Sequence, residues 1–177
     1  MGMVPEYFRL PQERLMRGLS SFAEAQRLTE ELIEFSAACV LNPEEVARSP
    51  FGVADPDKAW DAIHYTLDPG RRAGKRYART TGLGGRLILG ATPAPDPLRK
   101  QPKWWIGYTM TSAVQALAEE LRTVNFGALL ATAQLGGVTD QLYSNYDDAR
   151  LVYWYEQLAR LYWRAADLDQ AVLILES

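Results

Sequence analysis

The sequence predicts an α+β fold in which helices pack on a small mixed or antiparallel sheet, as a single compact domain over residues 1–177. Short apolar or alternating runs, typical of strands, occur at residues 3–10, 104–110 and 171–175. Between these runs, apolar side chains recur every three or four positions, as on the buried face of a helix. Of the 177 residues, 47% are hydrophobic, which suits one substantial core, whereas two domains would each be small.

The N-terminal third predicts one strand followed by helices, the last of them a short helix that starts at Asn42 and ends before Ser49. Residues 3–10 include Pro5, which lacks an N–H and therefore favours the start of a strand or an edge position. Residues 11–18 predict a short helix that a glycine ends. A longer helix follows, and its buried face carries Phe22, Ala25, Leu28, Leu32, Phe35 and Cys39.

The stretch that begins at Asp55 is the densest in specific side chains. Asp55 and Pro56 are typical of a helix start, because aspartate accepts from free backbone amides and proline loses no hydrogen bond there. Trp60 follows about one turn after this start, and His64 lies one further turn along, on the same face, which we expect to be buried. His64 is the only histidine, and with Trp60 and Asp61 it defines a candidate pocket for acid/base chemistry or ligand binding. The alternative is a structural histidine that donates to a backbone carbonyl beside Trp60.

The strongest shift in local composition follows this helix. Residues 71–86 contain arginines, a lysine and glycines but no acidic residue, and they show no apolar period, so we expect a long loop. The glycines match no nucleotide-binding pattern. This loop is either simply solvated or binds a partner, and the candidate partner-binding residues are Arg71, Arg72, Lys75, Arg76, Arg79 and Trp105.

The second half predicts two more strands before a series of helices. Residues 87–91 form a short apolar run that fits an inner strand. Alternation along residues 104–110 places Ile106 and Tyr108 on one face, so that Trp105 is exposed or covers a neighbouring helix.

Helices are expected at residues 111–124, 126–135 and 148–166, ahead of the last strand. The aspartates before the last helix do not match a calcium loop, and capping by Asn145 or Asp147 explains them.

Composition argues against several classes of function. The net charge of −3 does not favour nucleic acid or an anionic membrane as a partner. One cysteine, Cys39, permits no internal disulfide. No apolar stretch reaches the roughly 20 residues that span a bilayer, and the first residues lack a secretory pattern, so we expect a cytoplasmic protein. We expect no cofactor and no metal, and the oligomeric state stays open.

Four segments together resemble a known family: residues 1–3, 7–10, 57–65 and 171–174. They are similar to the bacterial YfbM-like family, also called DUF1877, and the Asp-Lys-Ala-Trp-x-x-Ile-His block at residues 57–64 is the most specific part. The resemblance implies a compact α+β domain and no established reaction. The basic segment and the proline-rich run from Thr92 depart from the family pattern.

Three functions stay open, because motifs of known enzyme classes are nearly absent. We expect a non-catalytic interaction protein, in particular an immunity-type protein that binds and blocks a bacterial toxin. The alternatives are a small-molecule-binding domain and an acid/base enzyme, each using a pocket near His64.

Overall fold

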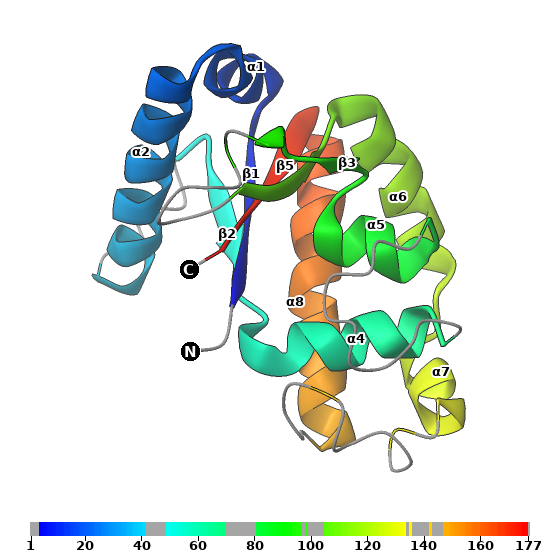
Figure 1. Ribbon diagram of the computed structural model, residues 1–177. Helices are drawn as coiled ribbons and strands as arrows, with labels where there is room; N and C mark the ends of the chain where they lie inside the picture. The colour runs from blue at the N-terminus through cyan, green and yellow to red at the C-terminus, as the bar shows by residue number, and fades with distance from the viewer. Residues whose placement is uncertain are drawn as a thin grey trace.

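An open five-stranded sheet, antiparallel at every pairing, runs through the middle of the molecule in the order β2-β1-β5-β4-β3 (Figure 1). The computed structural model describes residues 4–41, 49–69, 81–96, 98, 105–133, 135, 142 and 147–176. The strands are β1 (Pro5–Pro11), β2 (Gly52–Ala54), β3 (Thr92–Pro93), β4 (Trp105–Thr109) and β5 (Gln170–Glu176). The predicted fold class is confirmed, and the sheet is antiparallel.

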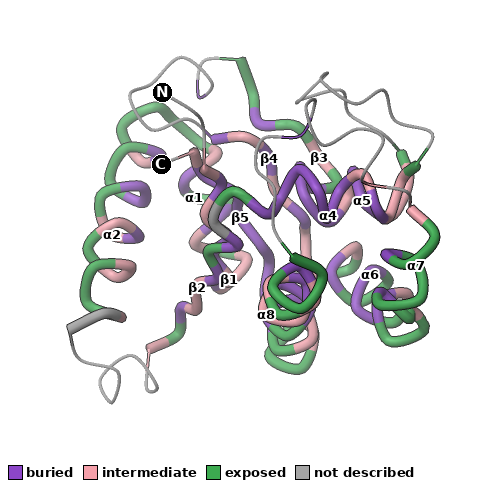
Figure 2. Tube along the Cα trace, turned by 90° about the horizontal axis from the view of Figure 1, so that it is seen from below, coloured by how far each residue is buried: buried purple, intermediate pink, exposed green. Residues whose placement is uncertain are grey.

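Helices cover both faces of this sheet (Figure 1). The hairpin of α1 (Gln12–Ser20) and α2 (Phe22–Leu41) lies on one face. The other face carries α4 (Trp60–Leu67), which follows the 3₁₀ turn Asp57–Ala59, together with α5 (Leu83–Leu89), α6 (Thr111–Thr123), α7 (Phe126–Thr132) and α8 (Asp148–Asp167). Figure 2 shows the sheet between α2 and α8, with green, exposed residues on the outer sides of both helices. Among the described residues, no helix is both long and apolar enough to span a membrane.

The sheet separates two hydrophobic cores. Because side chains alternate across a strand, Tyr7 and Ile174 pack with α4, α5, α6 and α8, whereas Phe8 and Leu173 pack with α1 and α2. β5 is buried along almost its whole length, since it has a core on each side. That position explains why its sequence is a continuous apolar run and does not alternate.

The predicted strand at residues 87–91 is wrong, because this segment ends α5. A short apolar run fits a buried helix as well as a strand. The last carbonyls of a helix have no partner within it, and here two tyrosine hydroxyls supply partners. Tyr7 Oη donates to the carbonyl of Ile88 at 3.0 Å, and Tyr162 Oη donates to that of Leu87 at 3.2 Å.

The predicted alternation along β4 also fails, because the register shifts between Trp105 and Gly107. A β-bulge of this kind turns side chains to the other face. Ile106 consequently packs against the core that contains α8, whereas Trp105 and Tyr108 both lie on the α1/α2 side.

Candidate functional site

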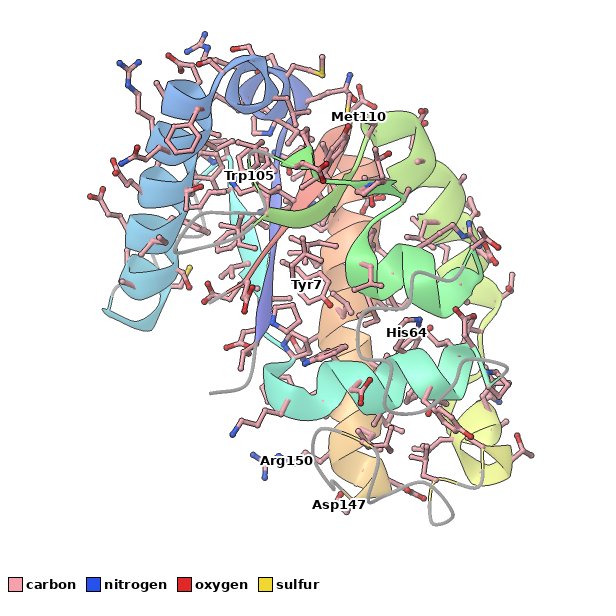
Figure 3. All side chains as sticks on the ribbon, in the orientation of Figure 1. Tyr7, His64, Trp105, Met110, Asp147 and Arg150 are labelled. Atoms are coloured by element: carbon pink, nitrogen blue, oxygen red, sulfur yellow. The ribbon has the colours of Figure 1, made fainter. Side chains whose placement is uncertain are left out.

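The predicted pocket residues all lie in the interior, on α4. Trp60, Asp61 and His64 are each 0% exposed. His64 lies on the side of α4 that faces α5, since a Cβ atom added to Gly84 would lie 2.9 Å from His64 Cδ2 (Figure 3). The helix that carries them begins as a 3₁₀ turn after Pro56, whose carbonyl accepts from the Ala59 amide at 3.1 Å.

Asp68 connects this cluster to α5. Its Oδ2 atom lies 3.6 Å from His64 Nε2 and accepts a hydrogen bond from the Gly85 amide at 2.9 Å. The amides in the first turn of a helix have no partner within the helix, so this carboxylate fixes α5 against α4. Gly84 permits the close approach, because a Cβ there would lie 2.8 Å from the His64 carbonyl oxygen.

Replacing Asp68 with alanine is expected to lower the free energy of unfolding by about 0.5–2 kcal/mol, the usual cost of losing a side-chain helix cap. Asp68→Asn keeps an oxygen that accepts from the Gly85 amide, so it should recover most of that loss. Urea denaturation of the three proteins at pH 7 measures the difference. Equal destabilisation by both substitutions would show that this hydrogen bond is not the important contact.

This arrangement could move a proton only for a substrate that reaches the interior. Asp61 and His64 have no exposed surface, and the grooves that the described residues form around α2 and α8 are lined by other side chains. Within the described part of the chain, no three acidic, histidine or cysteine side chains are grouped so that they could hold a metal ion.

Of the predicted partner-binding residues, the structure describes only Trp105. Arg71, Arg72, Lys75, Arg76 and Arg79 lie outside the residues that the structure describes. Trp105 is 2% exposed, and its indole Nε1 donates to Thr29 Oγ1 at 2.9 Å inside the α1/α2 core. The assignment of Trp105 to a partner surface is therefore wrong, since the register shift in β4 places the ring on the face of the sheet that α1 and α2 cover.

A surface that the sequence analysis missed runs along α8. It begins after the predicted cap, which is confirmed, since Asp147 Oδ1 accepts from the Arg150 amide at 2.8 Å (Figure 3). Residues three or four positions apart lie on the same side of a helix. By this spacing, five side chains of α8 share its outer side, towards β2. We call them the α8 stripe: Arg150, Tyr153, Trp154, Arg160 and Arg164.

The α8 stripe borders a groove between α8 and the sheet edge. Val53, Ala54 and Asp55 form one wall, and Tyr153, Trp154, Gln157, Arg160 and Leu161 form the other. The groove holds about 310 Å³. Tyr153 is 52% exposed, and the buried Trp154 Nε1 has no hydrogen-bond partner among the described residues. The sequence did contain one signal for this surface. The spacing of the arginines along α8 indicates which side of the helix faces solvent.

A second groove of about 680 Å³ lies on the other side of α8, against α7. Tyr155 forms part of its wall and stacks on Phe126, with 4.2 Å between ring centroids. The Tyr155 hydroxyl is buried without a hydrogen-bond partner in the described part of the chain. Burial raises the pKa of Tyr155 to about 12.

Tyr155 makes the protein sensitive to alkaline pH. Its pKa is about 10 in an unfolded chain, so between pH 10 and pH 12 only the unfolded state releases the proton, and stability falls as pH rises. We expect Tyr155→Phe to be at least as stable as wild type at pH 7, because no hydrogen bond is lost. At pH 11 the variant should gain about 1 kcal/mol relative to wild type. Urea denaturation at both pH values tests this, and an unchanged difference would contradict it.

The fold and the side-chain arrangement define an α+β protein with an antiparallel sheet, a buried histidine that contacts Asp68, and an aromatic, arginine-rich outer helix. The chain belongs to the DUF1877 family, described as a domain of unknown function, whose model matches residues 1–175.

A solved structure shares the fold of this chain. The chain is similar to YfbM from Escherichia coli, itself described as a protein of unknown function, at 15% identity and a TM-score of 0.64. The match covers 99% of this chain and 100% of that one, and at this identity it shows the fold alone. A comparison with curated proteins finds no match.

Proposed function

We propose that this protein is a non-catalytic interaction protein of the bacterial cytoplasm that binds a partner protein through the α8 stripe. The observation that carries the proposal is the composition of that surface. Tyrosine, tryptophan and arginine are the residues most enriched at binding hot spots, and here they are gathered on one side of one helix. The adjoining groove would receive an apolar side chain of the partner between Val53 and Trp154.

The charge of the surface suggests the chemistry of the partner. The whole protein carries more acidic than basic residues, 22 against 19, yet the α8 stripe has three arginines and no carboxylate. Asp55 lies across the groove and Glu156 pairs with Arg160 at 2.9 Å, whereas Arg164 forms no ion pair with a described residue. A partner with an acidic rim would therefore be favoured, and its association should weaken as salt rises.

Inhibition of a bacterial toxin, as by an immunity protein, is the particular form of binding that we propose. In that case the α8 stripe would cover or adjoin the active site of the toxin. A toxin gene next to the gene for this protein would support this form, whereas a metabolic operon would count against it.

Affinity capture from the native bacterium tests the proposal when it is combined with matched variants. Tyr153→Ala with Arg160→Ala removes two exposed side chains of the α8 stripe, and Phe22→Ala removes a side chain that is 54% exposed on α2. We expect a captured protein whose affinity falls at least about tenfold with the double variant and is unchanged with Phe22→Ala, because truncating a hot-spot residue costs about 2 kcal/mol or more. If the double variant binds the captured protein as tightly as wild type does, the α8 stripe is not the interface. Equal loss of affinity in the double variant and in Phe22→Ala would reject it as well.

A second candidate function is a small-molecule-binding or acid/base site at Asp61 and His64. It is supported by the complete burial of two ionisable side chains on neighbouring turns of one helix, which is uncommon without a specific reason. A metabolite that raises the melting temperature of the wild type but not of His64→Gln would favour this function over the first. No such metabolite in a broad thermal-shift screen would count against it.

A further inference from the structure

Arg9 on β1 has a half-buried guanidinium whose hydrogen-bond partners in the described part of the chain carry no charge. Its Nη1 atom donates to Gln170 Oε1 at 2.7 Å and to the Pro50 carbonyl oxygen at 3.3 Å. Gln170 is itself held, because its Nε2 atom donates to the same Pro50 carbonyl at 2.6 Å. Two connected hydrogen bonds therefore fix the guanidinium, and neither neutralises its charge.

The absence of a side chain at Gly52 leaves the space that the Arg9 side chain occupies. The two residues lie opposite one another in the pairing of β1 with β2. A Cβ atom at Gly52 would come within 2.3 Å of Arg9 Nε and 2.9 Å of Arg9 Cγ. The arginine side chain therefore lies across the bare backbone of the glycine, and any larger residue would push it away.

Arg164 of α8 brings a second positive charge near Arg9. Leu161, one turn earlier on α8, lines the groove with Val53 and Ala54, so the next turn lies beside Gly52 and the Arg9 side chain. Burial lowers the pKa of Arg9, and the positive charge of Arg164 lowers it further. The second effect falls off with distance, so it agrees with the placement from the helix and strand geometry.

The two guanidinium groups lack an acidic partner in the described part of the chain. Arg9 contacts the neutral groups named above, and Arg164, which is exposed, forms no ion pair with any described residue. By contrast, Arg14, Arg27, Arg86, Arg122 and Arg160 all pair with a carboxylate. Two like charges that lie close to each other repel unless an anion lies between them.

We infer that Arg9 and Arg164 form a binding site for an oxyanion, a carboxylate or a phosphate group, with Gln170 positioning Arg9. A guanidinium presents parallel N–H donors that match the two oxygens of such a group. An anion bound between Arg9 and Arg164 would attract both guanidinium groups and so offset their mutual repulsion. The site lies at one end of the α8 stripe, so in a complex its natural occupant would be an acidic side chain of the partner, a use that rests on the proposed function.

Titration of the isolated protein tests the site without any partner. Inorganic phosphate and acetate are added in separate arms at constant ionic strength, with chloride as the reference, and the arginine Nε–Hε resonances are followed by NMR. We expect saturable shifts of the Arg9 and Arg164 resonances. Acetate that binds about as well as phosphate would indicate a carboxylate occupant, and a clear preference for phosphate would indicate a phosphorylated ligand.

Three variants separate the site from a general effect of charge. Arg164→Gln removes one guanidinium, and Gly52→Ala displaces Arg9 while leaving the net charge unchanged. Each should weaken anion binding about tenfold, roughly the contribution of one charge-assisted hydrogen bond. Arg27→Gln, on an exposed arginine of α2 that pairs with Glu24, removes the same charge and should leave binding unchanged. A circular dichroism melt of each variant establishes that it is folded.

Chloride shifts equal to those of phosphate, or equal weakening by Arg27→Gln and Arg164→Gln, would overturn the inference. Failure of the proposed function would look different. The site would then still bind free anions in wild type and lose them in Gly52→Ala, while no captured protein would depend on Tyr153 and Arg160.

Discussion

Truncation of Trp105 to alanine is expected to destabilise the protein by about 3–5 kcal/mol, the usual range for a buried tryptophan. The ring is 2% exposed in the core between the sheet and the α1/α2 hairpin. The ring also packs closely against α1, since a Cβ at Gly18 would lie 2.8 Å from Trp105 Cη2. The substitution therefore leaves a cavity that α1 and α2 cannot fill without moving off the sheet.

Urea denaturation of the wild type, Trp105→Ala and Trp105→Phe measures this effect. Phenylalanine keeps much of the apolar volume but cannot donate to Thr29 Oγ1, so we expect an intermediate loss. Tyr153→Ala, at an exposed aromatic, should change stability by no more than about 0.5 kcal/mol. If Trp105→Ala were as mild as Tyr153→Ala, Trp105 would not be the core residue that the structure shows.

Replacing Gly84 with alanine is expected to cost about 1–3 kcal/mol, as overpacking of a tight core does. The added methyl would lie 2.8 Å from the His64 carbonyl oxygen and 2.9 Å from His64 Cδ2. The first of these is a backbone atom of α4, which cannot rotate away as the end of a side chain can. Helices α4 and α5 would have to separate, which would also stretch the Asp68–Gly85 hydrogen bond.

Gly127 of α7 is a matched control for Gly84. A Cβ there would meet only Asn125 Oδ1, at 3.8 Å, so it has open space. Alanine favours a helix over glycine, and Gly127→Ala should be neutral or stabilising by up to about 1 kcal/mol. Thermal and urea denaturation of both variants compare the same chemical change in two surroundings. Similar effects at the two glycines would contradict the close contact of α4 with α5.

Local pattern predicted much of this fold because the signals lie within single elements. The apolar face of α8 and its cap at Asp147 depend on residues a few positions apart, so neither requires knowledge of a distant contact. The same holds for the burial of Trp60 and His64, which follows from their spacing on α4.

The predicted strand at residues 87–91 and the assignment of Trp105 to a partner surface were wrong because both structures depend on distant residues. The end of α5 is completed by hydroxyls of Tyr7 and Tyr162, which lie far away in the chain. The direction of Trp105 depends on where β4 shifts its register against β5. Neither contact has a signature in the segment itself.

The binding surfaces also combine features that one element determines with features that depend on distant segments. Arginine spacing along α8 marked its solvent side, but the groove exists only because β2 lies alongside that helix. The pairing of Arg9 with Arg164 requires a strand near the N-terminus to lie beside a helix near the C-terminus.

The sequence by itself determined the α+β class, most helices, the strands β1, β4 and β5, and the buried face that holds His64. Periodicity within an element sets which side chains can share a face. Only the tertiary structure decided that the run ending at Leu89 is helical, that Trp105 is internal and that Arg160 lines a groove. These outcomes depend on packing between segments far apart in the chain, where a single hydrogen bond or a shift of register changes which face a side chain occupies.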